Sequence, residues 1–410
     1  MIQVLVLTSR LIESRYSGYD LRVANLCAHI PGTLHLVIAP LGPKTPGKPT
    51  LSTAGLFNSV EELAPLLEGQ REPWRHLRLT DDSFLKRSSP RRFGAARDRL
   101  HAVMRQRRIT HVVVFGGNLA ELADTLRHPR VILDVCDSVS LTARREIEWS
   151  AERPPVSLRW KRRLDLHRSK ATEASLPHRF SQVTTVSPPD TREIERLAGV
   201  TSNVLTVPNG VDDAFLGPLP EPGRHRAVAF WGNQAFGPNL EALRFFVTEV
   251  YHPVLRPAGV EVCIFGPNAP RWLNVLAAED AGILLPGYIP DLRAGVKHYP
   301  VMVNPMRTGS GLKNKVLEAF GLGLVVVSTP LGMEALPTAQ DGVHFIAAPD
   351  GPTFASAILS LLEDEPRRLA IRSAAKALLH GHYRWDIVGS TWRSLFEGDG
   401  SNGSRASDTT

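Results

Sequence analysis

Short apolar runs alternate with polar, glycine-bearing turns and with helically spaced segments along most of this chain. Runs rich in β-branched residues predict buried strands, among them residues 2–7, 111–115, 131–135, 227–231 and 324–327. Helical spacing follows many of them, as in the segment 91–107, and residues 60–67 are predicted to form a short helix. Repeated strand–turn–helix units indicate an α/β protein with parallel sheets.

A chain of 410 residues with 43% hydrophobic content suggests two domains of ordinary size. Three prolines between Gly217 and Gly223 mark a linker. The predicted parts are an N-terminal domain (1–216), the linker (217–223), a C-terminal domain (224–380), a C-terminal helix (381–397) and a disordered tail (398–410). The tail is predicted from its Gly, Ser, Asp and Thr content.

The segment from Val301 to Leu336 carries the strongest chemical signal. A strand leads into the turn Arg307-Thr308-Gly309-Ser310-Gly311, and a helix with Lys313, Asn314, Lys315 and Glu318 follows. Open α/β sheets bind ligands at the carboxyl ends of their strands, and a helix N-terminus after glycines suits a phosphate. The alternative is an ordinary strand–helix–strand unit whose glycines only form turns.

The spacing Gly309-x-Gly311-x-Lys313-x-Lys315-x-x-Glu318-Ala319 resembles the nucleotide-sugar site of family-4 glycosyltransferases. The segments Ser187–Asp190 and Pro208–Asp212 are also similar to segments of that family. The resemblance implies a GT-B fold, with two Rossmann-like, doubly wound domains facing across a cleft and a C-terminal helix that crosses back to the first domain. It implies that the N-terminal domain (1–216) is the acceptor side and that the C-terminal domain (224–380) binds the nucleotide sugar. It also implies a retaining transferase that requires no metal.

The resemblance implies a ribose-binding role for Glu318, base contacts for Tyr288 and Ile289, and a place near the donor sugar for Glu334. The remaining predicted nucleotide-sugar-binding residues are Gly18, Asn233, Gly266, Gly309, Ser310, Gly311, Lys313, Asn314 and Lys315. Two departures from the family stand out. Ser310 occupies the position of a first glutamate, and Asn233, Gln234 and Asn239 stand where a basic pair is common.

Without that basic pair, Arg307, Lys313 and Lys315 are expected to hold the diphosphate, with Arg307 and Lys313 stabilising the leaving group. Asp137, after a predicted strand, is the candidate acceptor-activating base. Many relatives place a histidine in this neighbourhood, and a helix cap or an ion pair with Arg144 is an equal alternative for Asp137.

The net charge of +7 is concentrated in residues 86–108 and 144–170. An anionic membrane surface or a diphosphate substrate would complement it, as would nucleic acid, but no nucleic-acid-binding motif is present. Trp160 between Arg159 and Lys161 favours the membrane surface. Solvated helix faces are the alternative. Three separated cysteines predict free thiols in a reducing cytoplasm, and no spacing suggests a zinc site.

We therefore expect a glycosyltransferase that takes a nucleoside-diphosphate sugar as co-substrate and uses neither cofactor nor metal. Its expected acceptor is a glycan, a polyprenyl-linked precursor or a small molecule, in exopolysaccharide or other cell-surface glycan synthesis. The start MIQVLVLTSR is typical of a strand rather than of a signal peptide, which predicts a cytoplasmic protein. A peripheral position at the inner face of the cytoplasmic membrane is the accompanying expectation. The alternatives are a transferase of soluble secondary metabolites and a non-catalytic sugar-nucleotide binder. A dehydrogenase would carry a Gly-rich fingerprint where Thr8-Ser9-Arg10 stand.

Overall fold

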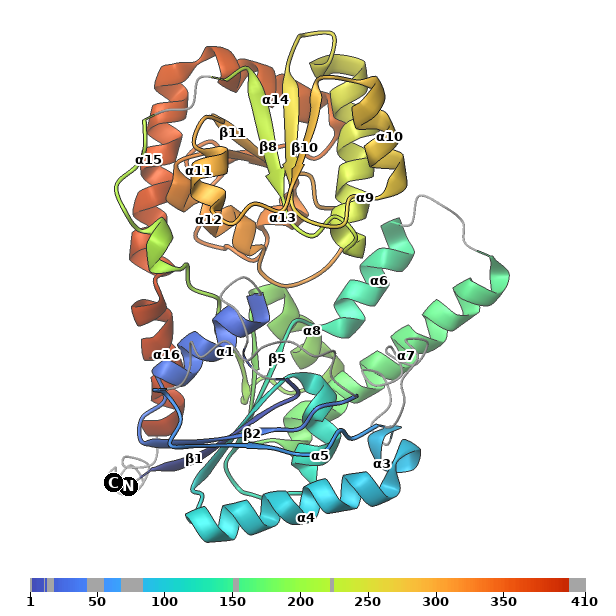
Figure 1. Cartoon of the computed structure of the whole chain (residues 1–410), viewed down its shortest axis with the longest axis vertical. Helices are drawn as coiled ribbons and strands as arrows, with labels where there is room; N and C mark the ends of the chain where they lie inside the picture. Colours follow the sequence, from blue (N-terminus) through green and yellow to red (C-terminus); the bar gives the residue numbers. More distant parts are fainter. Residues whose placement is uncertain are drawn as a thin grey trace, which may run out of the picture. The chain divides into compact units, whose positions relative to one another are not determined.

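The computed structural model describes residues 2–10, 12, 18–42, 55–67, 84–149, 155–221 and 225–397. They form two α/β units (Figure 1). The first unit takes its described residues from 1–144 and 152–208 and from the chain after residue 385. The second takes its described residues from 145–151 and 209–385. The predicted linker and tail lie partly and wholly, respectively, outside the described residues.

The first unit is built on a parallel seven-stranded sheet with the strand order β3-β2-β1-β4-β5-β6-β7. Its strands are β1 (Gln3–Thr8), β2 (Thr33–Ile38), β3 (Ser59–Glu62), β4 (His111–Phe115), β5 (Val131–Cys136), β6 (Gln182–Thr185) and β7 (Val204–Thr206). The central strands are buried along nearly their whole length, as parallel strands covered on both faces must be.

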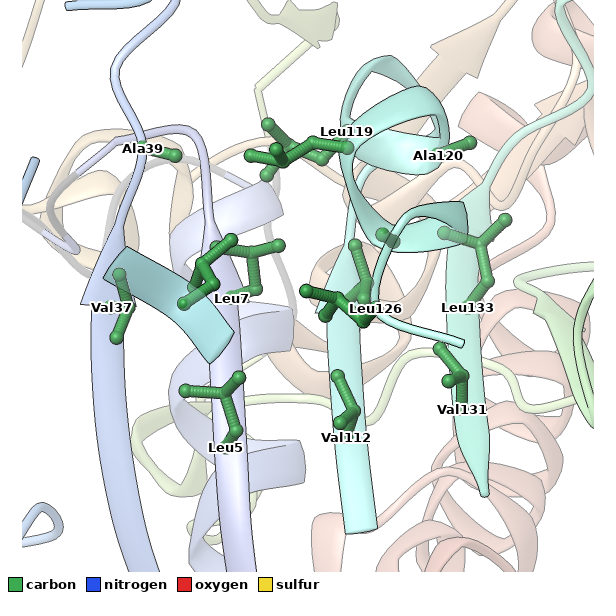
Figure 2. Packing of buried hydrophobic residues seen from close by; sticks show 14 of the residues in the cluster. Leu5, Leu7, Val37, Ala39, Val112, Leu119, Ala120, Leu126, Val131 and Leu133 are labelled. Carbon is green, nitrogen blue, oxygen red and sulfur yellow. The ribbon is translucent and has the colours of Figure 1, made fainter. Parts of the chain in front are cut away.

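Helices cover both faces of this sheet. They are α1 (Gly18–Ala28), α3 (Phe84–Ser88), α4 (Pro90–Arg107), η2 (Gly117–Leu119), α5 (Ala120–Asp124), α7 (Val156–Arg179), α8 (Pro188–Ala198) and α16 (Trp385–Glu397). The helix α6 (Val139–Trp149) begins in this unit, and its residues from Arg145 onward belong to the second unit. Figure 2 shows Leu5, Leu7 and Val112 packing with residues that follow β4 on one face. On the other face Trp392 of α16 packs against Phe115, with ring centroids 6.1 Å apart. Alternate side chains of β4 therefore pack on opposite faces of the sheet.

The second unit has a parallel six-stranded sheet with the order β10-β9-β8-β11-β12-β13. Its strands are β8 (Ala227–Trp231), β9 (Glu261–Phe265), β10 (Ile283–Gly287), β11 (Val301–Asn304), β12 (Val325–Ser328) and β13 (Ile346–Ala347). The order reverses beside β8, between β9 and β11, which is where an open α/β sheet forms its ligand crevice.

The helices of the second unit are η3 (Asp213–Phe215), α9 (Gly237–Phe245), η4 (Phe246–Leu255), α10 (Arg271–Glu279), α11 (Leu292–Val296), α12 (Asn314–Leu322), α13 (Pro330–Met333), α14 (Gly351–Glu363) and α15 (Glu365–His382). Val301 and Val303 of β11 join the core that contains α14, whereas Met302 joins the core that contains α12 and α15. The sheet thus presents α12 at one face, with its N-terminus after β11.

The predicted short helix at residues 60–67 is wrong, because Ser59–Glu62 is the edge strand β3. It pairs in parallel with β2, and Val60 is 57% exposed on it. Pairing with β2 supplies backbone hydrogen bonds that the local spacing of apolar residues does not reveal. Among the described helices, none combines the length and hydropathy that crossing a bilayer requires.

Candidate functional site

Glycine turns bring the backbone close together at the carboxyl ends of β8, β9 and β11. Gly232 and Gly266 follow β8 and β9 with φ of 144° and 128°. A Cβ on Gly266 would lie 2.0 Å from the Gly232 carbonyl oxygen, so only glycine fits. Gly309 and Gly311, after β11, have φ of 87° and 72°. At these turns the chain passes close to itself without intervening side chains.

Lys313 stands at the N-cap of α12 and braces the turn before it. Its ammonium group donates to the Ser310 carbonyl at 2.6 Å and to the Gly311 carbonyl at 2.9 Å. The turn and the helix N-terminus are thus held as one piece. The predicted role of Lys313 as a catalytic cation stays a prediction.

Lys315 is the second residue of α12, and its ammonium group contacts side chains from other elements. Its Nζ donates to Asn239 Oδ1 at 2.7 Å and lies 4.2 Å from the centroid of the Phe230 ring. Asn239 Nδ2 donates in turn to the Asn233 carbonyl at 2.9 Å. Burial lowers the pKa of Lys315 to about 7, and the neighbouring Lys313 acts in the same direction. Because burial disfavours the charged form of Lys315, a bound anion would stabilise that form.

Glu318 faces the last residue of β8. The Trp231 indole N–H donates to Glu318 Oε2 at 2.7 Å. Burial raises the pKa of Glu318, while the hydrogen bond from Trp231 and the charge of Lys315 oppose that rise. Two successive aromatic residues of β8 therefore position the two charged residues of α12. The sequence analysis missed both, because aromatic residues in an apolar strand are indistinguishable from ordinary core residues.

Asn314, also predicted to contact the nucleotide sugar, accepts a hydrogen bond from Asn209 Nδ2 at 3.0 Å. Asn233 Oδ1 accepts from the Ala235 amide at 3.1 Å and from Asn268 Nδ2 at 3.2 Å. Both asparagines thus organise the loops around the site. Neither contact identifies a ligand group by itself.

Arg307 is engaged by acidic and aromatic side chains. Its guanidinium lies 3.4 Å from Glu241 and 3.3 Å from Glu249, and 4.0 Å from the centroid of the Phe245 ring. Two carboxylates already compensate this charge. The arrangement gives no support to the predicted role of Arg307 in holding a diphosphate, which stays a prediction.

Glu334 and the predicted base-binding residues lie elsewhere at this end of the second unit. Glu334 forms a bidentate ion pair with Arg145, at 2.6 and 2.7 Å, and Arg145 also donates to the Gly309 carbonyl at 2.8 Å. Tyr288, 56% exposed, and the half-buried Ile289 follow β10, whose Gly287 carbonyl accepts from the Gly266 amide at 2.8 Å. Their roles stay predictions.

Gly18 and Asp137 belong to the first unit. Gly18 is the first residue of α1. The exposed Asp137 follows β5, directly after Cys136, whose φ of 64° is left-handed. The next residue, Ser138, is fixed by two buried carboxylates: its amide donates to Asp190 at 2.8 Å and its hydroxyl to Glu173 at 2.8 Å. Asp137 therefore lies in a loop that these hydrogen bonds hold in place, which would suit a catalytic base. Its role as the base stays a prediction.

The second unit thus brings most of the predicted residues together, from Gly309 to Glu318 with Asn233 and Gly266. Among the described residues no group of three or more His, Cys, Asp or Glu side chains is arranged to hold a metal ion. A ligand here would meet the half-buried Lys315, the half-buried Glu318 and the N-terminus of α12, a set that suits a diphosphate next to a polyhydroxylated group.

Residues 225–364 match a protein-family model described as "Glycosyl transferases group 1". No curated protein matches the chain. Among solved structures, sucrose-phosphate synthase of Thermosynechococcus elongatus aligns with TM-score 0.69 at 13% identity, covering 96% of this chain and 98% of its own. HepE of Anabaena, solved with UDP, aligns with TM-score 0.67 at 12% identity, covering 97% and 100%. WaaG, a glycosyltransferase of lipopolysaccharide biosynthesis, aligns with TM-score 0.61 at 11% identity, covering 97% and 100%. These alignments confirm the predicted GT-B fold. The match over residues 225–364 agrees with the predicted family.

Proposed function

We propose that this chain, whose residues 225–364 match the model of group 1 glycosyl transferases, transfers a sugar from a nucleoside-diphosphate sugar to a hydroxyl acceptor with retention of configuration. The observation that carries the donor assignment is the pair Lys315 and Glu318, one turn apart on α12 and each fixed by a partner. The neighbours' bound UDP, UDP-glucose and glucose agree with such a donor.

Glycosyl transfer builds positive charge on the sugar and negative charge on the departing diphosphate. A catalyst must place its donors where that negative charge develops. Lys315 and the amides at the start of α12 can do so in a water-poor site. Glu318 would repel a phosphate, so it suits the ribose hydroxyls instead. Asp137 is the proposed group that orients or activates the acceptor hydroxyl.

The proposed acceptor is a polyprenyl-linked or glycan precursor of exopolysaccharide or of another cell-surface glycan. It would be used at the anionic cytoplasmic face of the membrane. Its support is α7, on which Val156, Trp160 and Leu164 are 66%, 68% and 48% exposed. Their i, i+4, i+8 spacing forms one stripe, away from the buried Ser169 and Glu173. The exposed Arg159, Lys161 and Arg163 flank this stripe. Apolar side chains flanked by cations suit an anionic interface.

Turnover of UDP-, GDP- and dTDP-sugars, followed by NMR of the product anomer, tests the donor and the stereochemistry. Transfer that inverts the anomer would overturn retention. Binding of a donor without transfer or hydrolysis would favour a non-catalytic protein.

Co-sedimentation with phosphatidylglycerol vesicles at low salt tests the membrane surface. The double variant Trp160→Ser and Leu164→Ser is expected to lose binding, and Val60→Ser, which changes an exposed valine in β3, is expected to keep it. If the wild-type protein does not co-sediment with the vesicles and transfers sugar to a soluble acceptor, the result would favour a secondary-metabolite transferase.

A further inference from the structure

We infer that Trp231 is a positioning residue for donor recognition: its indole N–H holds one oxygen of Glu318 so that the other accepts a ribose hydroxyl. The inference rests on the proposed function, because it presumes a ribonucleotide donor. It assigns the selection of a ribose over a deoxyribose to a side chain that makes no ligand contact of its own.

The two side chains differ in how firmly the fold holds them. Trp231 is 5% exposed and ends the central strand β8, which is paired on both sides by β9 and β11. Its ring packs in the apolar cluster that contains Val316 and Phe320 of α12. Glu318 has three rotatable side-chain bonds, and ordering such a side chain costs entropy. The 2.7 Å bond from the fixed indole to Oε2 therefore orders the carboxylate before a ligand arrives.

The chemistry of the indole suits this role. Indole is a donor only and carries no charge, so it orients the carboxylate without neutralising it. Within the described part of the chain, the bond from Trp231 is the one hydrogen bond that reaches the Glu318 side chain. The second oxygen thus stays available as an acceptor. A carboxylate oxygen is the natural partner of a hydroxyl donor such as the 2′- or 3′-OH of ribose.

A purely space-filling Trp231 would behave differently. Replacing it would then weaken the packing around α12 and affect every ligand alike. A positioning role predicts a selective loss, because only ligands with the ribose hydroxyl use the oriented oxygen. A site built around a hydroxyl discriminates strongly against the analogue that lacks it.

The test measures binding of UDP and GDP, each beside its 2′-deoxy and 3′-deoxy counterparts, by calorimetry. In the wild-type protein the ribonucleotide is expected to bind more tightly than at least one deoxy form. Trp231→Phe is expected to weaken ribonucleotide binding roughly tenfold and that deoxy form less than about twofold. Trp272→Phe is the matched control, because the indole N–H of Trp272 is buried without a hydrogen-bond partner. It is expected to change neither.

The double variant Trp231→Phe with Glu318→Gln separates coupling from packing. It is expected to lose no more ribose discrimination than Glu318→Gln alone, since both changes break one interaction. Should Trp231→Phe not fold, indole NMR of the wild-type protein and of Glu318→Gln replaces it. One indole N–H resonance is then expected to shift with the Glu318 change and with the ribonucleotide, but not with the deoxy form.

The outcomes are distinct. Equal loss for ribo and deoxy ligands in Trp231→Phe, or the absence of any such indole resonance, overturns the inference and leaves the proposed function standing. A wild-type protein that binds no nucleoside diphosphate and no nucleotide sugar overturns the proposed function, and the inference with it.

Discussion

Lys315 donates to Asn239 Oδ1 at 2.7 Å, although 76 positions separate the two residues in sequence. Asn239 belongs to α9 and is 6% exposed, and its amide nitrogen is itself committed to the Asn233 carbonyl. The contact binds the helix after β8 to the helix after β11 at the carboxyl ends of both strands. It gives a lysine with little water around it a neutral partner, which leaves its charge available for a diphosphate.

Donor binding is expected to weaken as pH rises above about 7, the pKa to which burial lowers Lys315. Below that pH the free protein already carries the proton. Above it, a proton must be taken up when the anion binds, so affinity falls by up to about tenfold per pH unit until the pKa of the bound state is reached. Calorimetry with a nucleotide sugar avoids the titration of a terminal phosphate.

Lys315→Arg is the control for this prediction, because arginine remains protonated throughout this range. The affinity of this variant for the donor is expected to change by less than about twofold between pH 6 and pH 9. A wild-type affinity that stays constant over the same range would show that Lys315 does not bind the diphosphate.

Glu318→Ala and Lys313→Ala are each expected to lower kcat/KM by roughly a hundredfold, or about 3 kcal/mol of transition-state stabilisation. Glu318→Ala removes the proposed ribose acceptor. Lys313→Ala removes a cation and the two bonds that brace the turn at Ser310 and Gly311. Lys297→Ala is the control, since this exposed lysine lies after α11. Near-normal turnover in both variants, with unchanged thermal unfolding, would refute the site.

The outcome for Gly309 to Glu318 shows what a local pattern can predict. Strand, turn and helix follow one another there without a break, so spacing alone brings Lys313, Lys315 and Glu318 to one end of the sheet. Arg307 shows the limit. Its partners Glu241 and Glu249 come from α9 and η4, far away in sequence, and no local signal reports that they capture it.

Trp231 illustrates a different limit. Its apolar ring fits the hydrophobic pattern of β8, so the sequence indicates a core residue, which it also is. Only the register of β8 beside β11 reveals that its N–H meets Glu318. The wrong prediction of a helix at residues 60–67 also arose from a contact that local sequence does not reveal. Pairing with β2 makes Ser59–Glu62 a strand.

Gly266→Ala is expected to destabilise the second unit by roughly 3 kcal/mol or more, because a new Cβ would overlap the Gly232 carbonyl at 2.0 Å and φ is 128°. Gly259→Ala is the control. Gly259 has φ of 68° and open space around it, so only the left-handed strain of about 1 kcal/mol remains. Urea unfolding compares the two variants. Equal losses would show that the backbones of these two turns are not in close contact.

Arg22 in α1 is a buried cation of the first unit. It is 1% exposed, and its guanidinium pairs with Asp134 through bonds of 2.8 and 2.6 Å while donating to the Val207 carbonyl at 2.8 Å. Arg22→Met would leave the buried Asp134 carboxylate without a cation, with Thr184 as its remaining donor among the described residues. We expect a loss of about 3–5 kcal/mol in the free energy of unfolding.

The exposed pair of Arg99 and Glu61 provides the comparison for Arg22. These side chains also meet in a bidentate arrangement, at 2.5 and 2.8 Å, but both lie at the surface. Arg99→Met is therefore expected to lower the free energy of unfolding far less than Arg22→Met does. Adding Asp134→Asn to Arg22→Met should recover part of the loss, because a buried amide costs less than a buried carboxylate. A double variant less stable than Arg22→Met would show that Asp134 is stabilised by groups other than Arg22.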